Sequence, residues 1–127
     1  MQRLTVEQIV EETIEYYRTH SRSINPFSAQ TECLYNGPNG ERCAFSRCCI
    51  ENAVSKLTEN KSAALIIDFH GDEILLPQYR GHNPLFWADL QSLHDINIYW
   101  VPNKYGGNDL TIVGSKRVER ILVKHAS

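Results

Sequence analysis

The sequence has no long apolar run and no strong excess of charge of either sign. None of its apolar stretches approaches the roughly 20 residues that span a bilayer, so we expect no membrane segment. The 13 Lys and Arg residues stand against 15 Asp and Glu residues, which argues against a dedicated nucleic-acid-binding protein. Residues 1–7 become acidic where a signal peptide needs an apolar stretch. These absences together predict a cytoplasmic protein.

The usual motifs of metal and phosphate sites are missing as well. Four cysteines crowd into residues 33–49, but their spacing is not that of paired zinc knuckles. Burial as small apolar side chains is their simplest interpretation, while a nucleophilic thiol at Cys48 or Cys49 is the alternative, since an early helical position lowers a thiol pKa. Gly106-Gly107 has no P-loop lysine. We predict no catalytic residue, no metal and no cofactor.

What the sequence does contain is typical of one compact domain over residues 1–127. The chain is 42% hydrophobic, and at this length folding removes about two-thirds of the unfolded chain's surface from water. Capping residues followed by apolar residues at helical spacing predict helices that begin after Thr5, Ser46, Asn83 and Thr111. The apolar run 63–69 fits either a helix or a strand, and we favour a helix.

One hairpin signal interrupts the helical pattern. Asn39-Gly40 lies between two strand-like runs, 32–35 and 42–45, and this dipeptide suits a tight turn. Residues 101–108 are expected to form a loop. The predicted fold class is therefore α+β: a mostly helical single domain of four to five helices with a small antiparallel β-hairpin at about residues 31–46.

The most suggestive polar cluster lies just before the predicted helix at Asn83. An exposed arginine and histidine beside free helix N–H groups would form an anion pocket, with aromatic rings to stack a base. The ligand-binding residues that we predict are Tyr79, Arg80, His82, Lys104 and Tyr105.

The predicted last helix is basic on its outer side. Such a face contacts an acidic partner or phosphates in some proteins, but it is more often simply solvated, and late cations also suit the helix dipole. The interaction surface that we predict comprises Lys116, Arg117, Arg120 and Lys124.

Two acidic–histidine clusters suggest a further alternative. A metal-dependent hydrolase could use both clusters if they converge on one cleft. The first cluster is His70 with Asp72, and the second is His94 with Asp95. A structural role is favoured for each cluster, because isolated motifs of this kind are weak evidence.

Three segments together resemble a known group of proteins. They are Cys33-x-Tyr35 with residues 40–47 (GERCAFSR), residues 86–95 (FWADLQSLHD), and Leu110-Thr111-x-x-Gly114. The set resembles short, uncharacterised accessory proteins of bacteriophages and prophages, in which a C-A-x-G-R hairpin precedes an L-Q-x-L-H-D helix. Ser46 departs from the glycine of that pattern. The resemblance implies a mobile-element protein acting inside a bacterial cell, and it transfers no catalytic residue.

These observations lead to three hypotheses of function. The preferred one is a small phage accessory protein that binds and inhibits a host protein, such as an anti-phage defence component, without catalysis. The second is a sponge for a small anionic, nucleotide-like ligand, and the third is the metal-dependent hydrolase. A homodimer is also considered, because pairing would bury aromatic residues such as Trp87 and Trp100.

Overall fold

The computed structural model describes residues 2–23, 35, 37, 40–54 and 62–126. The longer helices are α1 (Val6–Arg18), α3 (Ala63–His70), α4 (Pro84–Asp95) and α5 (Ile112–Lys124). The shorter elements are the helical turn α2 (Glu51–Val54), the 3-10 turns η1 (Ser46–Cys48), η2 (Asp72–Ile74), η3 (Pro77–Tyr79) and η4 (Asn97–Tyr99), and the strands β1 (Trp100–Pro102) and β2 (Asn108–Leu110). The predicted α+β class, four helices plus a small antiparallel sheet, is confirmed.

The helix starts follow the predicted caps closely. Thr5 accepts a hydrogen bond from the backbone of Gln8 and completes a capping box, as the spacing predicts. The side chains of Asn83 and Thr111 likewise cap α4 and α5. The ambiguous run 63–69 is helical, because Ser62 caps it by accepting from the backbone of Leu65.

The hairpin lies elsewhere in the sequence than predicted. Residues 41–45 form a loop and a turn, so the predicted strand 42–45 is wrong, while most of 31–36 lies outside the described residues. The small sheet instead pairs β1 with β2, which lie at the two ends of the expected loop 101–108. Asn103 holds its turn: the side-chain oxygen accepts from the backbone of Tyr105 at 2.9 Å and of Gly107 at 3.1 Å.

The helix predicted after Ser46 is broken into η1 and α2. The backbone between these turns pairs with a distant segment, since Ile50 N donates to Ile74 O at 2.8 Å and Leu76 N donates to Cys48 O at 2.9 Å. These long-range bonds take carbonyl and amide groups that a continuous helix needs. Residues 55–61, which follow α2, lie outside the described residues.

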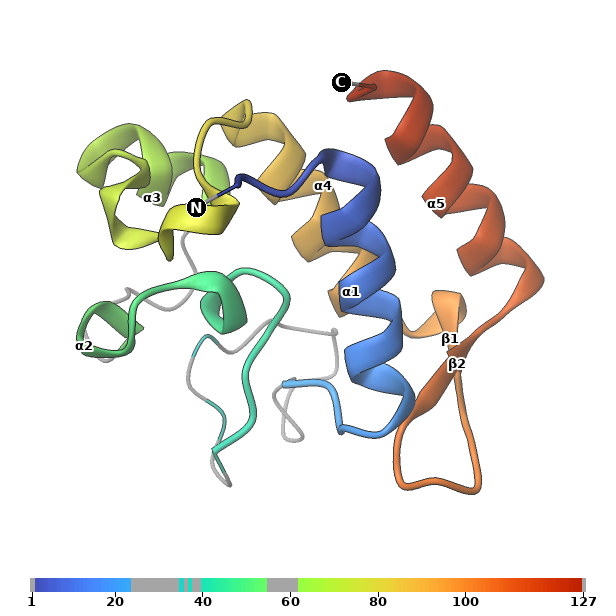
Figure 1. Ribbon diagram of the computed structural model, residues 1–127. Helices are drawn as coiled ribbons and strands as arrows, with labels where there is room; N and C mark the ends of the chain where they lie inside the picture. The colour runs from blue at the N-terminus through green and yellow to red at the C-terminus, as the bar shows by residue number, and fades with distance from the viewer. Residues whose placement is uncertain (1, 24–34, 36, 38–39, 55–61, 127) are drawn as a thin grey trace.

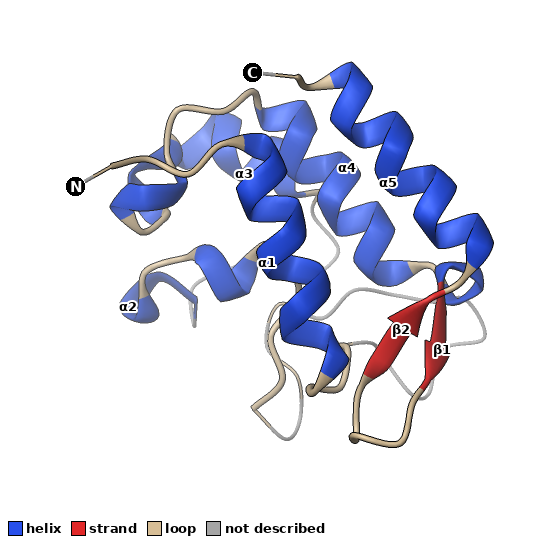
Figure 2. Ribbon diagram, turned by 45° about the vertical axis from the view of Figure 1, so that its right-hand side comes forward, coloured by secondary structure: helices blue, strands red, loops and turns tan. Residues whose placement is uncertain are grey.

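Helices α4 and α5 run antiparallel, and α1 runs in the same direction as α4. One end of the molecule therefore holds the start of α1, the start of α4 and the end of α5 (Figures 1 and 2). The β1–β2 hairpin lies at the opposite end (Figure 2). Both tryptophans belong to the core: Trp87 is fully buried and the indole N–H of Trp100 donates to Leu93 O at 2.7 Å. The expectation that they are exposed for a dimer to cover is therefore wrong.

Candidate functional site

Two of the predicted ligand-binding residues are engaged by the protein itself. Tyr79 is buried and its hydroxyl donates to the carboxylate of Glu12. The guanidinium of Arg80 donates to the carbonyl oxygens of Leu75 at 3.0 Å and Glu73 at 3.1 Å. Both side chains thus hold the segment between α3 and α4 in place, which a sequence pattern does not reveal.

Lys104 and Tyr105 lie far from these two residues. They occupy the tip of the β1–β2 hairpin, at the opposite end of the molecule from η3 (Figures 1 and 2). The ammonium group of Lys104 lies 5.4 Å from the centre of the Tyr105 ring. The five predicted ligand residues are therefore not brought together in one place.

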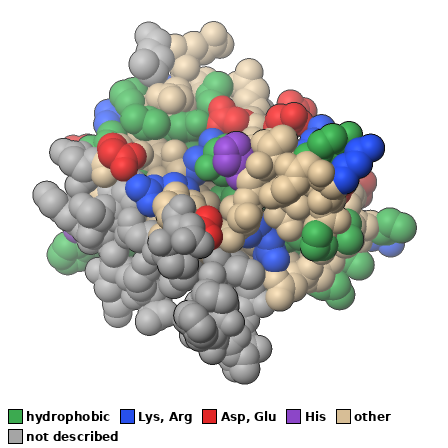
Figure 3. All heavy atoms as spheres, turned by 90° about the horizontal axis from the view of Figure 1, so that it is seen from below, with side chains coloured by type: hydrophobic (Ala, Val, Ile, Leu, Met, Phe, Trp, Pro, Cys, Tyr) green, Lys and Arg blue, Asp and Glu red, His purple; other side chains and the backbone are tan. Residues whose placement is uncertain are grey.

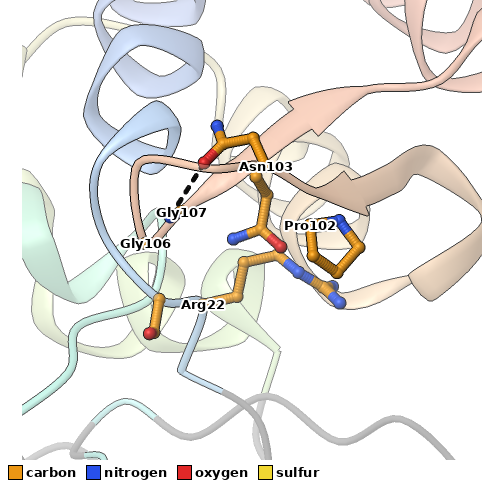
Figure 4. Close-up of a pocket in the computed structure, with 7 residues that line it drawn as sticks. Arg22, Pro102, Asn103, Gly106 and Gly107 are labelled. Carbon is orange, nitrogen blue, oxygen red and sulfur yellow. Dashed lines mark hydrogen bonds between the residues drawn. The ribbon is translucent and has the colours of Figure 1, made fainter.

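The hairpin forms one side of an open polar pocket of about 410 Å³ (Figure 4). Arg22 and Asn103 are its main polar side chains. Arg22 donates to His94 O at 2.7 Å and to Asn97 Oδ1 at 2.5 Å, and Asn103 Nδ2 donates to Arg18 O at 2.9 Å. The Arg22 bonds tie the segment after α1 to α4 and η4, and the Asn103 bond ties the hairpin to the end of α1, so the pocket walls are made by structural contacts.

A partly buried polar cluster that the sequence did not single out joins α1, η1 and η3. Arg47 Nη1 donates to Glu12 Oε1 at 2.7 Å, and Arg47 Nη2 donates to Thr13 Oγ1 at 3.1 Å. The guanidinium also lies 5.2 Å from the ring centre of Tyr16. The only sequence feature that pointed to Arg47 was its place in the 40–47 motif. Its partners in α1 and η3 are distant in sequence and could not be predicted from that motif.

The cysteine thiols lie inside this part of the core. Cys48 and Cys49 are buried, and burial raises the pKa of the Cys48 thiol to about 12. The Cys49 thiol pKa is raised as well, again mainly by burial. Such thiols stay protonated at neutral pH, which favours the apolar interpretation over a nucleophile. Cys33 lies outside the described residues.

The acidic–histidine clusters do not form a shared metal site in the described part of the chain, where no three His, Cys, Asp or Glu side chains come together suitably. His94 is fully buried and both its ring nitrogens are engaged. Its Nε2 accepts from Ser23 N at 3.1 Å and its Nδ1 bonds Asp95 Oδ1 at 2.8 Å. This pattern is that of a structural histidine.

The predicted basic surface of α5 divides into two parts. Arg117 and Lys124 pair with Asp89 of α4, at 3.3 and 3.0 Å, so they do not extend freely from the outer side as predicted. Burial opposes ionisation of Asp89, but hydrogen bonds from His125 and Lys124 outweigh it and lower the pKa of this carboxyl. Lys116 and Arg120 are exposed and have no ion-pair partner among the described residues.

The face of the molecule seen in Figure 3 does not gather charge of one sign among its described residues. On the face in Figure 3, the described Lys and Arg side chains are interspersed with Asp and Glu. No helix in the described ranges has the length and apolar character needed to cross a membrane.

A second pocket, here called the helix-end pocket, lies where α1 and α4 begin and α5 ends. Its volume is about 290 Å³, and it is lined by Val6, Gly81, His82, Asn83, Phe86, Lys124, His125 and Ala126. His82 and Lys124 come from the two sets of residues predicted separately. The structure therefore brings one member of each set together.

Comparisons of the chain with protein-family models, with curated proteins and with solved structures give no match.

Proposed function

We propose that this is a non-catalytic binding protein whose helix α5 contacts an acidic partner protein. As an accessory protein of a phage or other mobile element, it would act in a bacterial host cell and block a host component, such as an anti-phage defence protein. The resemblance of residues 40–47 and 86–95 to phage and prophage proteins supports this biological context. The exposed side of α5 supports the proposed binding of a partner protein.

The observation that carries the proposal is an apolar and basic stripe along α5. Helix α5 lies at the edge of the molecule, and its inner side packs through Ile121 while its outer side is uncovered by other described elements (Figures 1 and 2). We define the outer face of α5 by the exposed residues that share one side at helical spacing: Ile112, Lys116, Glu119, Arg120 and Val123.

The two apolar ends of this face are unusually open to solvent. The exposed fractions of Ile112 and Val123 are 78% and 81%. Covering a side chain of this size stabilises a complex by about 1.5–3 kcal/mol before the costs of association. Exposed apolar residues that share one helix face with charged residues are compatible with a protein-binding surface.

The charges on and beside this face indicate the chemistry of the partner. Lys116 and Arg120 lie between the apolar ends, and the four basic side chains of α5 outnumber Glu119 and the paired Asp89. A partner with carboxylates spaced to meet Lys116 and Arg120 gains electrostatic attraction and faster association. An acidic protein surface therefore fits this face better than a nucleic acid. The whole chain has slightly more acidic than basic residues, whereas nucleic-acid binding is favoured by an excess of basic ones.

The proposal is tested by capture of host proteins from phage-challenged bacterial cells. The double variant Lys116→Glu/Arg120→Glu and the single variant Ile112→Asp should each lose the protein that the wild type captures. Lys104→Glu, a reversal of charge at the distant hairpin tip, is the control and should retain it. All of these side chains are exposed, so the variants should fold with unchanged circular dichroism.

Capture that survives both α5 variants would refute the proposed surface. Native mass spectrometry of the purified wild type tests a different occupant. If it shows a dimer that the α5 variants dissociate, a second copy of the chain covers this face, and the proposal of an acidic host partner is wrong.

A further inference from the structure

The geometry points to a binding site for the phosphate group of a small molecule in the helix-end pocket, held by Arg3, His82, Lys124 and His125. This site is separate from the outer face of α5 and does not depend on the proposed partner. It also differs from the predicted ligand site, because only His82 of that set takes part.

Three separate parts of the chain place nitrogen-bearing side chains in or beside this pocket: His82, Lys124 and His125 line it, and Arg3 lies next to it against Gly81. Arg3 precedes α1, His82 precedes α4, and Lys124 and His125 lie at the end of α5. The Arg3 guanidinium packs over Gly81: a Cβ added to that glycine would meet Arg3 Nη1 at 2.7 Å. Glycine at this position therefore leaves room for the guanidinium beside the pocket.

The positive charge around the pocket exceeds what the protein itself neutralises. Asp89 accepts from His125 at 2.7 Å and pairs with both Lys124 and Arg117. One carboxylate is thus shared by two permanent cations, and the exposed Arg3 forms no ion pair within the described part of the chain. The Lys124 ammonium has three N–H donors, so its contact with Asp89 leaves donors for an anion. Asp72 is a second acidic group near the pocket, since it accepts from the backbone N–H of the lining residue Gly81 at 2.8 Å.

The two histidines have defined tautomers that add to the site. His82 Nε2 must donate to Leu4 O at 2.8 Å, because a carbonyl oxygen only accepts. His125 Nε2 donates to the Asp89 carboxylate in the same way. Each ring therefore keeps Nδ1 as an acceptor when neutral and as a donor when protonated. Hydrogen phosphate offers both acceptor oxygens and an O–H, which matches lysine, arginine and imidazole together.

The size of the pocket limits the ligand. A volume of about 290 Å³ lies just below the usual range for small-molecule sites, roughly 300–1,000 Å³. The apolar side chains of Val6 and Phe86 form part of its wall. The pocket thus fits inorganic phosphate or a compact phosphorylated molecule.

Inorganic phosphate is the probe for the test, with sodium chloride at matched ionic strength as the reference. Titration of the isotopically labelled chain should shift the amide resonance of Gly81 and the imidazole resonances of His82 and His125 with phosphate, and not with chloride. Lys124→Gln should weaken this binding about tenfold, and Arg3→Gln should weaken it in the same direction. Lys116→Gln removes the same charge from the same helix outside the pocket and should leave the affinity unchanged.

Equal shifts with chloride, or an affinity that neither Lys124→Gln nor Arg3→Gln lowers, would overturn the inference. Both substituted side chains are exposed, and unchanged spectra elsewhere in the chain verify that each variant folds. Loss of phosphate binding leaves capture of a host protein through the outer face of α5 unaffected, so this inference and the proposed function fail separately.

Discussion

His94 illustrates how one titratable side chain is fixed inside the protein. Its ring is fully buried, and Nε2 accepts from the backbone N–H of Ser23. Burial lowers the pKa of His94, while the hydrogen bond and charge of Asp95 oppose that shift. Protonation of Nε2 would set two N–H groups against each other, so the folded protein disfavours the charged ring.

We therefore expect acid to destabilise the protein through His94. An unfolded histidine has a pKa near 6.5. Below that pH the unfolded chain binds a proton that the folded chain excludes, so stability falls as the pH drops from about 6.5 towards the lowered folded pKa, by up to about 1.4 kcal/mol per pH unit. Urea unfolding at several pH values measures this slope.

The variant His94→Gln should lose that part of the slope, since an amide oxygen can accept from Ser23 N without titrating. His20→Gln is the control, because His20 is exposed and its replacement should leave the slope as in the wild type. Equal slopes for wild type and His94→Gln would show that another group causes the acid sensitivity.

At the scale of elements, the contact between α5 and η4 depends on a glycine inside a helix. A Cβ added to Gly114 would lie 2.2 Å from the carbonyl oxygen of Tyr99. Thr111, which caps α5, also donates from its backbone to that oxygen at 2.9 Å. The first turn of α5 is thus pressed onto η4, and only a residue without a side chain allows the approach.

Gly114→Ala should consequently destabilise the protein by about 1–3 kcal/mol, the usual cost of overpacking. Helix propensity alone predicts the opposite sign, a gain of about 1 kcal/mol. Ser115→Ala, at the next and exposed position, is the matched control and should be neutral or slightly stabilising. Chemical unfolding monitored by circular dichroism decides the sign, and a stabilised Gly114→Ala protein would refute the close packing.

At the scale of the whole molecule, one continuous core joins the helices to the hairpin. Aromatic rings connect its parts: Phe45 lies 5.8 Å from Trp87, and Tyr17 lies 6.0 Å from Trp100, between ring centres. The fluorescence of Trp87 reports on the folding of α4 near the 43–49 segment, and the fluorescence of Trp100 reports on the folding of the hairpin. Because both belong to the same buried cluster, local unfolding of one part without the other is unfavourable.

We therefore expect two-state unfolding of a single domain. The chain has two tryptophans, so Trp100→Phe leaves Trp87 as the only reporter, and Trp87→Phe leaves Trp100. In each variant, the fluorescence midpoint in urea should coincide with the midpoint from circular dichroism. Separate midpoints in either variant would show that the hairpin and the α4 region unfold independently.

The sequence by itself determined features that depend on a few neighbouring residues. Thr5, Asn83 and Thr111 cap their helices as predicted, because a capping bond joins residues only two or three positions apart. The α+β class also followed, although the hairpin signal at Asn39-Gly40 pointed to the wrong segment. The strands of three residues in the true hairpin are too short for a periodic pattern.

Only the tertiary structure decided which polar side chains remain available for a ligand or partner. Tyr79 and Arg80 are occupied by Glu12 and by backbone carbonyls, and Asp89 engages Lys124. The helix-end pocket joins His82 to His125 across 43 positions of sequence. Such pairings depend on how the helices pack, and hydrogen bonding and charge act through space, so residue type and spacing along the chain do not contain them.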